Sequence, residues 1–241
     1  MKTAQVMESF SSAAETYDSC ANLQRHVAAL LAERLPELPD GEVLEIGCGT
    51  GLFTGHLCRR YADRWLTITD ISPAMVSRCW HKLYRQLPDR ARFQVLDGQE
   101  VFLDRPFALV AGSLVFQWYE HPLVGLTRAY RALKPGGWLV GAIPVEGSLV
   151  EWRQVCRQLD LPFTGLPLLS AEELADHFNV KAEVVTVIDS HPSALSFFRS
   201  LKGVGAHVSP SSLGHRLLQL VRWWKGPIEV TYKILLLQVK K

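Results

Sequence analysis

Short apolar runs alternate with amphipathic stretches along most of the chain. The runs have the length of strands, and the stretches between them repeat apolar residues at helical spacing. Strands are predicted over residues 43–46, 66–69, 93–96, 107–111, 138–143, 182–188 and 228–239, and helices over 52–61, 73–85, 123–133 and 171–178. Such alternation is typical of β–α–β units, so we predict an α/β fold with a mostly parallel, seven-stranded sheet and helices on both faces. Polar residues alternate within the last run, which fits a hairpin partner or an edge strand.

Two regions lie outside this alternation. Residues 1–40 repeat apolar residues at helical spacing and precede the first strand. About forty residues separate the last two predicted strands, far more than a usual connection, and they contain helical segments at 193–202 and 212–225. We expect the insertion 190–227 to cap a cofactor-binding core at 41–145, with the N-terminal helices as the other wall of the site. All 241 residues then form one domain.

Composition narrows the class of protein. Of the 241 residues, 48% are hydrophobic and 21% are charged, as in a soluble globular protein. The net charge of +2 is too balanced to indicate nucleic acid as the main partner. The five cysteines include no C-x-x-C pair, so we expect neither a disulfide framework nor a metal site, and a reducing cytoplasm. No signal-peptide pattern is present, and no apolar run approaches the roughly 20 residues that cross a bilayer, so we expect no membrane partner.

A glycine-rich segment follows the first predicted strand. It reads Glu45-Ile-Gly47-Cys-Gly49-Thr-Gly51, and Asp70 ends the next apolar run. Glycines at a strand–loop–helix junction let the backbone approach a ligand closely, and an acid at the end of the second strand can bind the two hydroxyls of a ribose. The segment therefore predicts a binding site for a nucleoside cofactor.

The glycine spacing indicates which cofactor. The dinucleotide pattern G-x-G-x-x-G would need a glycine at position 52, where the chain has Leu52, and no P-loop sequence is present. An acid beside the glycine turn suits a cofactor with a cationic ammonium tail and no phosphate. The pattern E-x-G-x-G-x-G resembles motif I of the S-adenosylmethionine-dependent methyltransferases of the Rossmann-like type. That resemblance implies a class I methyltransferase fold and S-adenosylmethionine as the cofactor.

The expected cofactor contacts lie at the carboxyl ends of the first four strands, where α/β proteins bind their ligands. Glu45 is expected to hold the ammonium group, Asp70 the ribose hydroxyls, and Asp97 the adenine amino group. The complete expected set is Glu45, Gly47, Gly49, Gly51, Asp70, Ile71, Asp97, Gly98, Gly112 and Ser113.

Further segments resemble one family within this superfamily, the malonyl-acyl carrier protein O-methyltransferases of biotin synthesis. They are spread over most of the chain, at residues 10–18, 23–25, 113–118, 145–149, 195–206 and 227–232. The most discriminating is Arg199-Ser-Leu-Lys202-Gly-Val-Gly205. The chain departs from the family pattern between Trp152 and Glu172, where it is short, and over residues 206–226. Those differences bear on the contacts with the carrier protein more than on the reaction.

The family resemblance implies methyl transfer to the free carboxylate of a malonyl thioester. A carboxylate with a pKa of about 4 is already ionised at pH 7, so no general base is expected. The side chains expected to orient the substrate are Tyr17, Gln117, Trp118, Arg199 and Lys202. Arg199 is included because the guanidinium fork matches a carboxylate.

The implied partner is an acidic acyl carrier protein, with malonyl-coenzyme A as an open alternative. Four basic residues in or beside the insertion can form its docking site, namely Lys202, Arg216, Arg222 and Lys225. Three other functions stay open: a methyltransferase acting on another small acid or on a phenol, a non-catalytic protein that binds S-adenosylmethionine, and a nicotinamide-dependent oxidoreductase. A phenol would need a general base that the sequence does not offer, and Leu52 argues against the nicotinamide cofactor.

Overall fold

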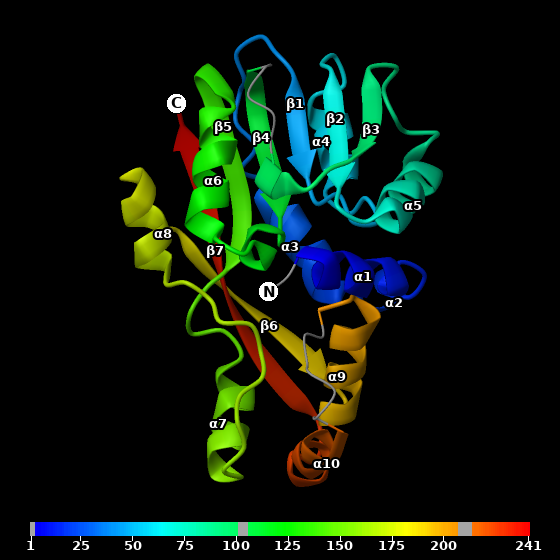
Figure 1. Ribbon diagram of the computed structural model, residues 1–241, viewed down its shortest axis with the longest axis vertical. Helices are drawn as coiled ribbons and strands as arrows, with labels where there is room; N and C mark the ends of the chain where they lie inside the picture. Colours follow the sequence, from blue (N-terminus) through cyan, green and yellow to red (C-terminus); the bar gives the residue numbers. More distant parts are fainter. Residues whose placement is uncertain (1–2, 101–105, 207–213) are drawn as a thin grey trace.

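The structure, a computed structural model, describes residues 3–100, 106–206 and 214–241 and contains a seven-stranded sheet (Figure 1). Its strands lie in the order β3-β2-β1-β4-β5-β7-β6. The neighbours from β3 to β5 are parallel, whereas β7 is antiparallel to both β5 and β6. The predicted α/β fold with a mostly parallel sheet is confirmed. The strands are β1 (Val43–Ile46), β2 (Leu66–Asp70), β3 (Ala91–Val95), β4 (Phe107–Ser113), β5 (Leu133–Pro144), β6 (Val184–His191) and β7 (Ile228–Lys240).

The last strand corrects one expectation. The alternation of polar residues in β7 suggested a hairpin partner or an edge strand. Strand β7 pairs antiparallel with the preceding strand β6, as a hairpin partner would, but it is not an edge strand, because it lies between β5 and β6. Residues 234–237 of β7 are all buried, because they pair with β5 and have core on both faces, and residues 234 and 235 pair with β6 as well. Polar residues concentrate in the first half of β7, which extends past the end of β5.

Helices cover both faces of the sheet, as predicted. On one face, Leu31 of α3, Leu57 of α4 and Cys79 of α5 pack in a common apolar core with inward-facing strand residues. On the other face, Leu126 of α6 and Leu174 of α8 pack in a second core. The helices are α1 (Thr3–Ala13), α2 (Tyr17–Cys20), α3 (Asn22–Ala32), α4 (Thr54–Arg60), α5 (Pro73–Leu83), α6 (Pro122–Arg131), α7 (Val150–Gln158), α8 (Ala171–Phe178), α9 (Ala194–Gly203) and α10 (Gly214–Trp223), with short 3-10 turns η1 (Gly98–Glu100) and η2 (Phe116–Trp118).

The remaining helices gather beyond the carboxyl ends of the parallel strands. Helices α7, α9 and α10 surround the extended ends of β6 and β7, and α1 and α2 lie between them and the rest of the sheet (Figure 1). The sequence predicted α9 and α10 but missed α7. None of the helices in the described ranges is long and apolar enough to cross a membrane.

The Lys-Gly-Val-Gly segment joins the end of α9 to the N-terminal helices. The Thr16 hydroxyl donates to the Gly203 carbonyl oxygen at 2.9 Å, and the Ser9 hydroxyl donates to the Gly205 carbonyl oxygen at 2.8 Å. A Cβ at Gly203 would lie 2.4 Å from the Cys20 sulfur, and Gly205 has a φ of +72°. Both positions therefore require glycine, which gives this family-like segment a structural role in closing α9 onto α1 and α2.

Candidate active site

The glycine-rich loop after β1 is held by Asp70, at the end of β2. The Gly49 N–H donates to Oδ2 of Asp70 at 2.8 Å, and the Ser72 N–H donates to Oδ1 at 2.9 Å. Burial raises the pKa of Asp70, while the backbone N–H groups that point at it oppose that rise. Gly47 has a φ of +71°, and a Cβ there would lie 2.5 Å from a methyl group of Val115. The loop is thus fixed in the conformation that brings bare backbone to the ligand.

Beside this loop lies a cavity that contains most of the predicted cofactor residues. It is lined by Gly47, Gly49, Asp70, Ile71, Asp97, Gly98 and Ser113. Gly51 and Gly112 are not on its wall. Gly51 packs against Leu83, and Gly112 packs against Val115. Both serve close packing around the loop, and their direct contact with a cofactor stays a prediction.

Glu45 also lies off the cavity wall, as one of the most buried charged residues of the protein. Its side chain is 1% exposed, and its Oε2 atom has no hydrogen-bond partner. Burial raises its pKa to about 8, with the Thr54 hydroxyl opposing the rise and Asp70 adding to it. An unpaired carboxyl oxygen beneath the loop fits a cofactor that carries a positive charge, since a nearby cation favours the ionised form. Together with the Asp70 carboxylate, these acceptor oxygens fit the ammonium group and the ribose hydroxyls of S-adenosylmethionine.

The raised pKa predicts how stability depends on pH. The folded protein keeps the Glu45 proton up to about pH 8, whereas an ordinary glutamate releases it near 4.5. Between these values the unfolded chain binds fewer protons, so the free energy of unfolding falls as the pH rises. Glu45→Gln removes this dependence. We expect its stability relative to the wild type to rise by on the order of 3 kcal/mol between pH 5 and pH 8, measured by urea unfolding.

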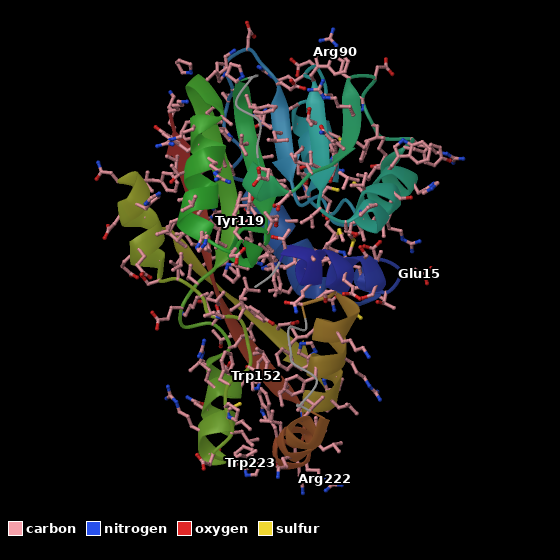
Figure 2. All side chains as sticks on the ribbon, viewed as in Figure 1. Glu15, Arg90, Tyr119, Trp152, Arg222 and Trp223 are labelled. Atoms are coloured by element: carbon pink, nitrogen blue, oxygen red, sulfur yellow. The ribbon has the colours of Figure 1, made fainter. Side chains whose placement is uncertain are left out.

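Glu15→Gln is the matched control for this experiment, because Glu15 is exposed on the protein surface (Figure 2). Its stability is expected to follow the wild type at each pH. Parallel pH profiles for Glu45→Gln and the wild type would mean that Glu45 is ionised in the folded protein at neutral pH.

Helix α1 covers the cofactor cavity. Thr3, Val6 and Phe10 line it, and the Ser11 hydroxyl lies 2.8 Å from that of Ser72. The free volume is about 70 Å³, below the 300–1,000 Å³ of ordinary small-molecule sites.

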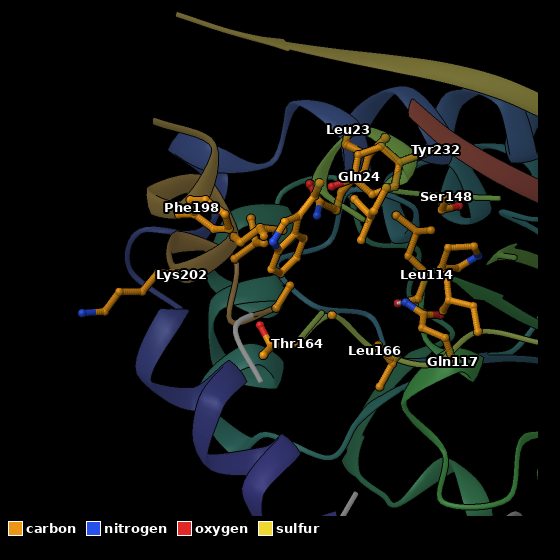
Figure 3. Close-up of a pocket in the computed structure, with 18 of the residues that line it drawn as sticks. Leu23, Gln24, Leu114, Gln117, Ser148, Thr164, Leu166, Phe198, Lys202 and Tyr232 are labelled. Atoms are coloured by element: carbon orange, nitrogen blue, oxygen red, sulfur yellow. Dashed lines mark hydrogen bonds between the residues drawn. The ribbon is translucent and has the colours of Figure 1, made fainter. Parts of the chain in front are cut away.

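A second cavity of about 280 Å³ lies under the cap. Its wall is largely apolar, with Leu23, Leu114, Trp152, Phe198, Leu201 and Leu220 among the residues that line it (Figure 3). It is bounded by the N-terminal helices, as predicted, by α9 and α10, and also by α7 and residues 164–168. Phe10, Tyr17, Leu114 and Trp118 line both cavities. The two cavities therefore share a wall, where a cofactor and a substrate can meet.

The structure separates the five predicted substrate residues. Tyr17 and Trp118 are on the shared wall, and the Trp118 ring packs edge to face on Phe10 with 5.3 Å between centroids. Gln117 and Lys202 line the apolar cavity alone, and the Lys202 ammonium group extends away from the other lining residues (Figure 3). Arg199 is exposed on α9 and lines neither cavity. Its contact with a substrate carboxylate stays a prediction.

Tyr17 is positioned by the residue that follows it. Asp18 accepts from the Thr50 hydroxyl at 2.6 Å and from the Lys82 ammonium group at 2.9 Å, which ties α2 to the glycine-rich loop and to α5. The pKa of Asp18 is lowered because these hydrogen bonds outweigh its partial burial. Burial raises the pKa of Tyr17 far above its usual value, and Asp70 and Asp18 raise it further. Its phenol therefore stays neutral and can donate a hydrogen bond at the shared wall.

The sequence placed Tyr119 in an aromatic cluster that could wall the site without giving it a role of its own, and it missed helix α7. Tyr119 lines the cofactor cavity, and its buried hydroxyl has no hydrogen-bond partner. Helix α7 brings Trp152 to the apolar cavity. Glu151 anchors this helix by accepting from the Thr231 N–H at 2.9 Å and from the Thr231 hydroxyl at 2.5 Å. The only sequence signal for α7 was a short amphipathic stretch, and its anchor lies eighty residues away on β7.

Comparison with known proteins agrees with this geometry. A family model described as a methyltransferase domain matches residues 43–137. The chain is 35% identical over 236 residues to the malonyl-acyl carrier protein O-methyltransferase of Magnetococcus marinus, covering 91% of this chain and 86% of that protein. The chain belongs to this family. A second member, from Herminiimonas arsenicoxydans, is 29% identical over 97% of this chain and 94% of its own length.

Solved structures show the same fold as this methyltransferase. The YcgJ protein of Bacillus subtilis superposes with a TM-score of 0.65 at 15% identity, covering 90% of this chain and 98% of that one. Geranyl diphosphate C-methyltransferase of Streptomyces coelicolor, solved with S-adenosyl-L-homocysteine, superposes with a TM-score of 0.54 at 15% identity, covering 88% of this chain and 77% of that one. The seven-stranded sheet is therefore that of the Rossmann-like class I methyltransferases.

Proposed function

We propose that this enzyme transfers a methyl group to the free carboxylate of a malonyl thioester carried on acyl carrier protein. The product would be the methyl ester that enters pimeloyl synthesis on the way to biotin. The cofactor is S-adenosylmethionine. The observation that supports the proposal is the wall shared by the two cavities, because the neutral phenol of Tyr17 lines both of them. The names of the curated relatives support the choice of substrate.

The reaction needs little acid–base chemistry from the protein. S-adenosylmethionine supplies a methyl group on a sulfonium centre, whose leaving group is a neutral thioether. The malonyl carboxylate is ionised at pH 7 and needs no base. Tyr17 donates a hydrogen bond that orients this carboxylate, while the rings of Phe10 and Trp118 exclude water from the shared wall. Asp70 and the backbone around Gly49 hold the cofactor side of the site.

The charges at the cap suit an acidic carrier protein. Lys202, Arg222 and Lys225 are exposed, and Arg222 lies with Trp223 on α10 at the end of the molecule away from the parallel strands (Figure 2). The side chain of Arg216 falls outside the described part of the chain. Exposed basic residues near the apolar cavity can steer an acidic partner toward it. All five cysteines are free, which supports a reducing, cytoplasmic location.

The function is tested by incubating the purified protein with methyl-labelled S-adenosylmethionine and either malonyl- or acetyl-carrier protein. We expect the mass of one methyl group to be gained by the malonyl form alone, because the acetyl form has no free carboxylate. Malonyl-coenzyme A and free malonate serve as further acceptors that measure how much the carrier contributes. Cofactor binding without transfer to any malonyl acceptor would instead support another acid as substrate, or a protein that binds the cofactor without catalysis.

A further inference from the structure

The segment between β6 and β7 contains basic residues but no acidic ones. Of the 26 Lys and Arg residues of the chain, five lie within residues 190–228, whereas all 24 Asp and Glu residues lie outside this segment. The five are Arg199, Lys202, Arg216, Arg222 and Lys225. Across the described part of the chain, no carboxylate lies within salt-bridge distance of Arg199, Lys202, Arg222 or Lys225. The cap therefore presents positive charge that the protein itself does not neutralise.

Helix α10 has large apolar residues on two faces. Leu217 and Leu220 line the apolar cavity, and Trp224 packs on the core beside them, so residues spaced by three and four positions form the inner face. Leu218 and Trp223 lie on the outer face, where their side chains are 52% and 48% exposed. The packing of the inner face does not use these two side chains. An exposed leucine and tryptophan on one short helix are more typical of a contact surface than of a solvated one.

The apolar and basic residues of the outer face are interleaved. At 3.6 residues per turn, Arg222 falls between Leu218 and Trp223 around the helix, and Figure 2 shows Arg222 and Trp223 together on α10. The exposed Lys225 follows at the end of the helix. Arginine and tryptophan are the residues that contribute most to binding energy in protein interfaces, whereas charge alone gives attraction without a defined contact.

This outer face is separated from the apolar cavity by the helix alone. The inner face of α10 lines the cavity, and the diameter of a helix is about 10 Å. Helix α9 packs against α10, and its exposed residues Arg199 and Lys202 extend the positive surface. Lys202 also lines the cavity, while its ammonium group extends outward (Figure 3). A partner bound to this surface is therefore close enough to place an attached arm in the cavity.

We propose that the outer face of α10 is the surface on which the acidic carrier protein docks, with Leu218 and Trp223 packing on apolar side chains of the carrier and Arg222 and Lys225 pairing with its carboxylates. This inference rests on the proposed function, because it takes the methyl acceptor to be attached to a carrier. A bilayer would need a continuous apolar face, and that of α10 points into the protein. Two apolar side chains set among cations suit an acidic protein surface instead.

The first test compares a malonyl group on the carrier protein with the same group on N-acetylcysteamine, which offers no protein surface. For Trp223→Ala we expect KM for malonyl-carrier protein to rise about tenfold with kcat little changed, and kcat/KM for malonyl-N-acetylcysteamine to stay within about twofold of the wild type. Trp80→Ala is the matched control, because Trp80 is 44% exposed on α5 and lines neither cavity. It should behave like the wild type with both acceptors.

The second test reverses one charge. Arg222→Glu should lower kcat/KM for malonyl-carrier protein at least about tenfold in about 50 mM NaCl, and the loss should shrink in about 500 mM NaCl, where ions screen exposed charges. Arg78→Glu is the control, because Arg78 is exposed on α5 and the same change of net charge is made away from the cap. An equal loss in both variants would mean that overall charge, and not this surface, governs the encounter, and it would overturn the inference.

Binding without turnover separates this inference from the proposed function. Fluorescence anisotropy of dye-labelled carrier protein whose arm has no malonyl group should give a dissociation constant about tenfold higher for Trp223→Ala than for the wild type. Equal dissociation constants, or no binding to the wild type, would overturn the inference. No turnover of any malonyl acceptor would overturn the proposed function, and the anisotropy would still decide whether the carrier docks on α10.

Two further controls exclude other causes. Trp223→Ala and Arg222→Glu should unfold at the wild-type temperature, because both side chains are exposed. Binding to phosphatidylglycerol vesicles is measured by cosedimentation, and we expect the same weak binding for the wild type and for Trp223→Ala. Loss of vesicle binding in Trp223→Ala, with unchanged binding of the carrier, would assign this surface to a membrane and overturn the inference.

Discussion

Asp70→Ala is expected to weaken binding of S-adenosylhomocysteine at least about 100-fold, which corresponds to about 3 kcal/mol. The carboxylate accepts from the N–H groups of Gly49 and Ser72, and both would lose their partner. The glycine-rich loop would then lose the hydrogen bond that fixes it, together with the group expected to hold the ribose hydroxyls. Isothermal titration calorimetry with the product S-adenosylhomocysteine avoids turnover and measures this directly.

Two further variants show whether a loss of affinity in Asp70→Ala comes from the carboxylate itself. Asp70→Asn keeps the size of the side chain and one acceptor oxygen, so its loss should be smaller than that of Asp70→Ala. Asp89→Ala removes an exposed carboxylate and should bind like the wild type. A dissociation constant for Asp70→Ala within about threefold of the wild type would exclude Asp70 from the cofactor site.

Tyr17→Phe is expected to lower kcat/KM for malonyl-carrier protein by about 100-fold, the usual effect of removing one well-placed donor in a dry site. The variant keeps the ring that lines both cavities and removes only the hydroxyl. Because the pKa of Tyr17 is raised by burial and by two neighbouring carboxylates, the hydroxyl keeps its proton across the physiological range. The wild-type rate should therefore show no loss attributable to this phenol between pH 7 and pH 9, measured by initial rates.

The control for Tyr17→Phe is Tyr84→Phe, because Tyr84 is exposed at the end of α5. Binding of S-adenosylhomocysteine should be unchanged in both variants, which separates orientation of the substrate from assembly of the cofactor site. Full activity in Tyr17→Phe would remove this hydroxyl from the reaction. A matching loss of cofactor affinity would show instead that it supports the loop.

The cofactor half of the site was predictable because it is encoded locally. A strand, its glycine turn and the acid after the next strand are neighbours in sequence, and β1 has the predicted bounds, Val43–Ile46. The parallel sheet then brings the ends of β1, β2 and β4 to one edge, so residues predicted separately, such as Asp70 and Ser113, meet in one cavity. The period of the apolar residues and the spacing of the glycines and acids suffice to predict that part of the molecule.

The substrate half depended on contacts between distant parts of the chain. Tyr17, Trp152 and Tyr232 line the same cavity although they come from the beginning, middle and end of the sequence. Arg199 and Lys202 are both exposed on α9, and only Lys202 also lines the apolar cavity, a difference that sequence spacing could not show.

The sequence by itself determined the fold class, the cofactor and the family, because each depends on short residue patterns that set the local backbone conformation. Only the tertiary structure decided which side chains line the apolar cavity. The free oxygen of Gln117 depends on a hydrogen bond to Leu114, and the neutral phenol of Tyr17 depends on its burial beside Asp70. The direction of a hydrogen bond and the desolvation of a side chain depend on the residues that pack around it in the folded protein. The order of residues along the chain does not reveal them.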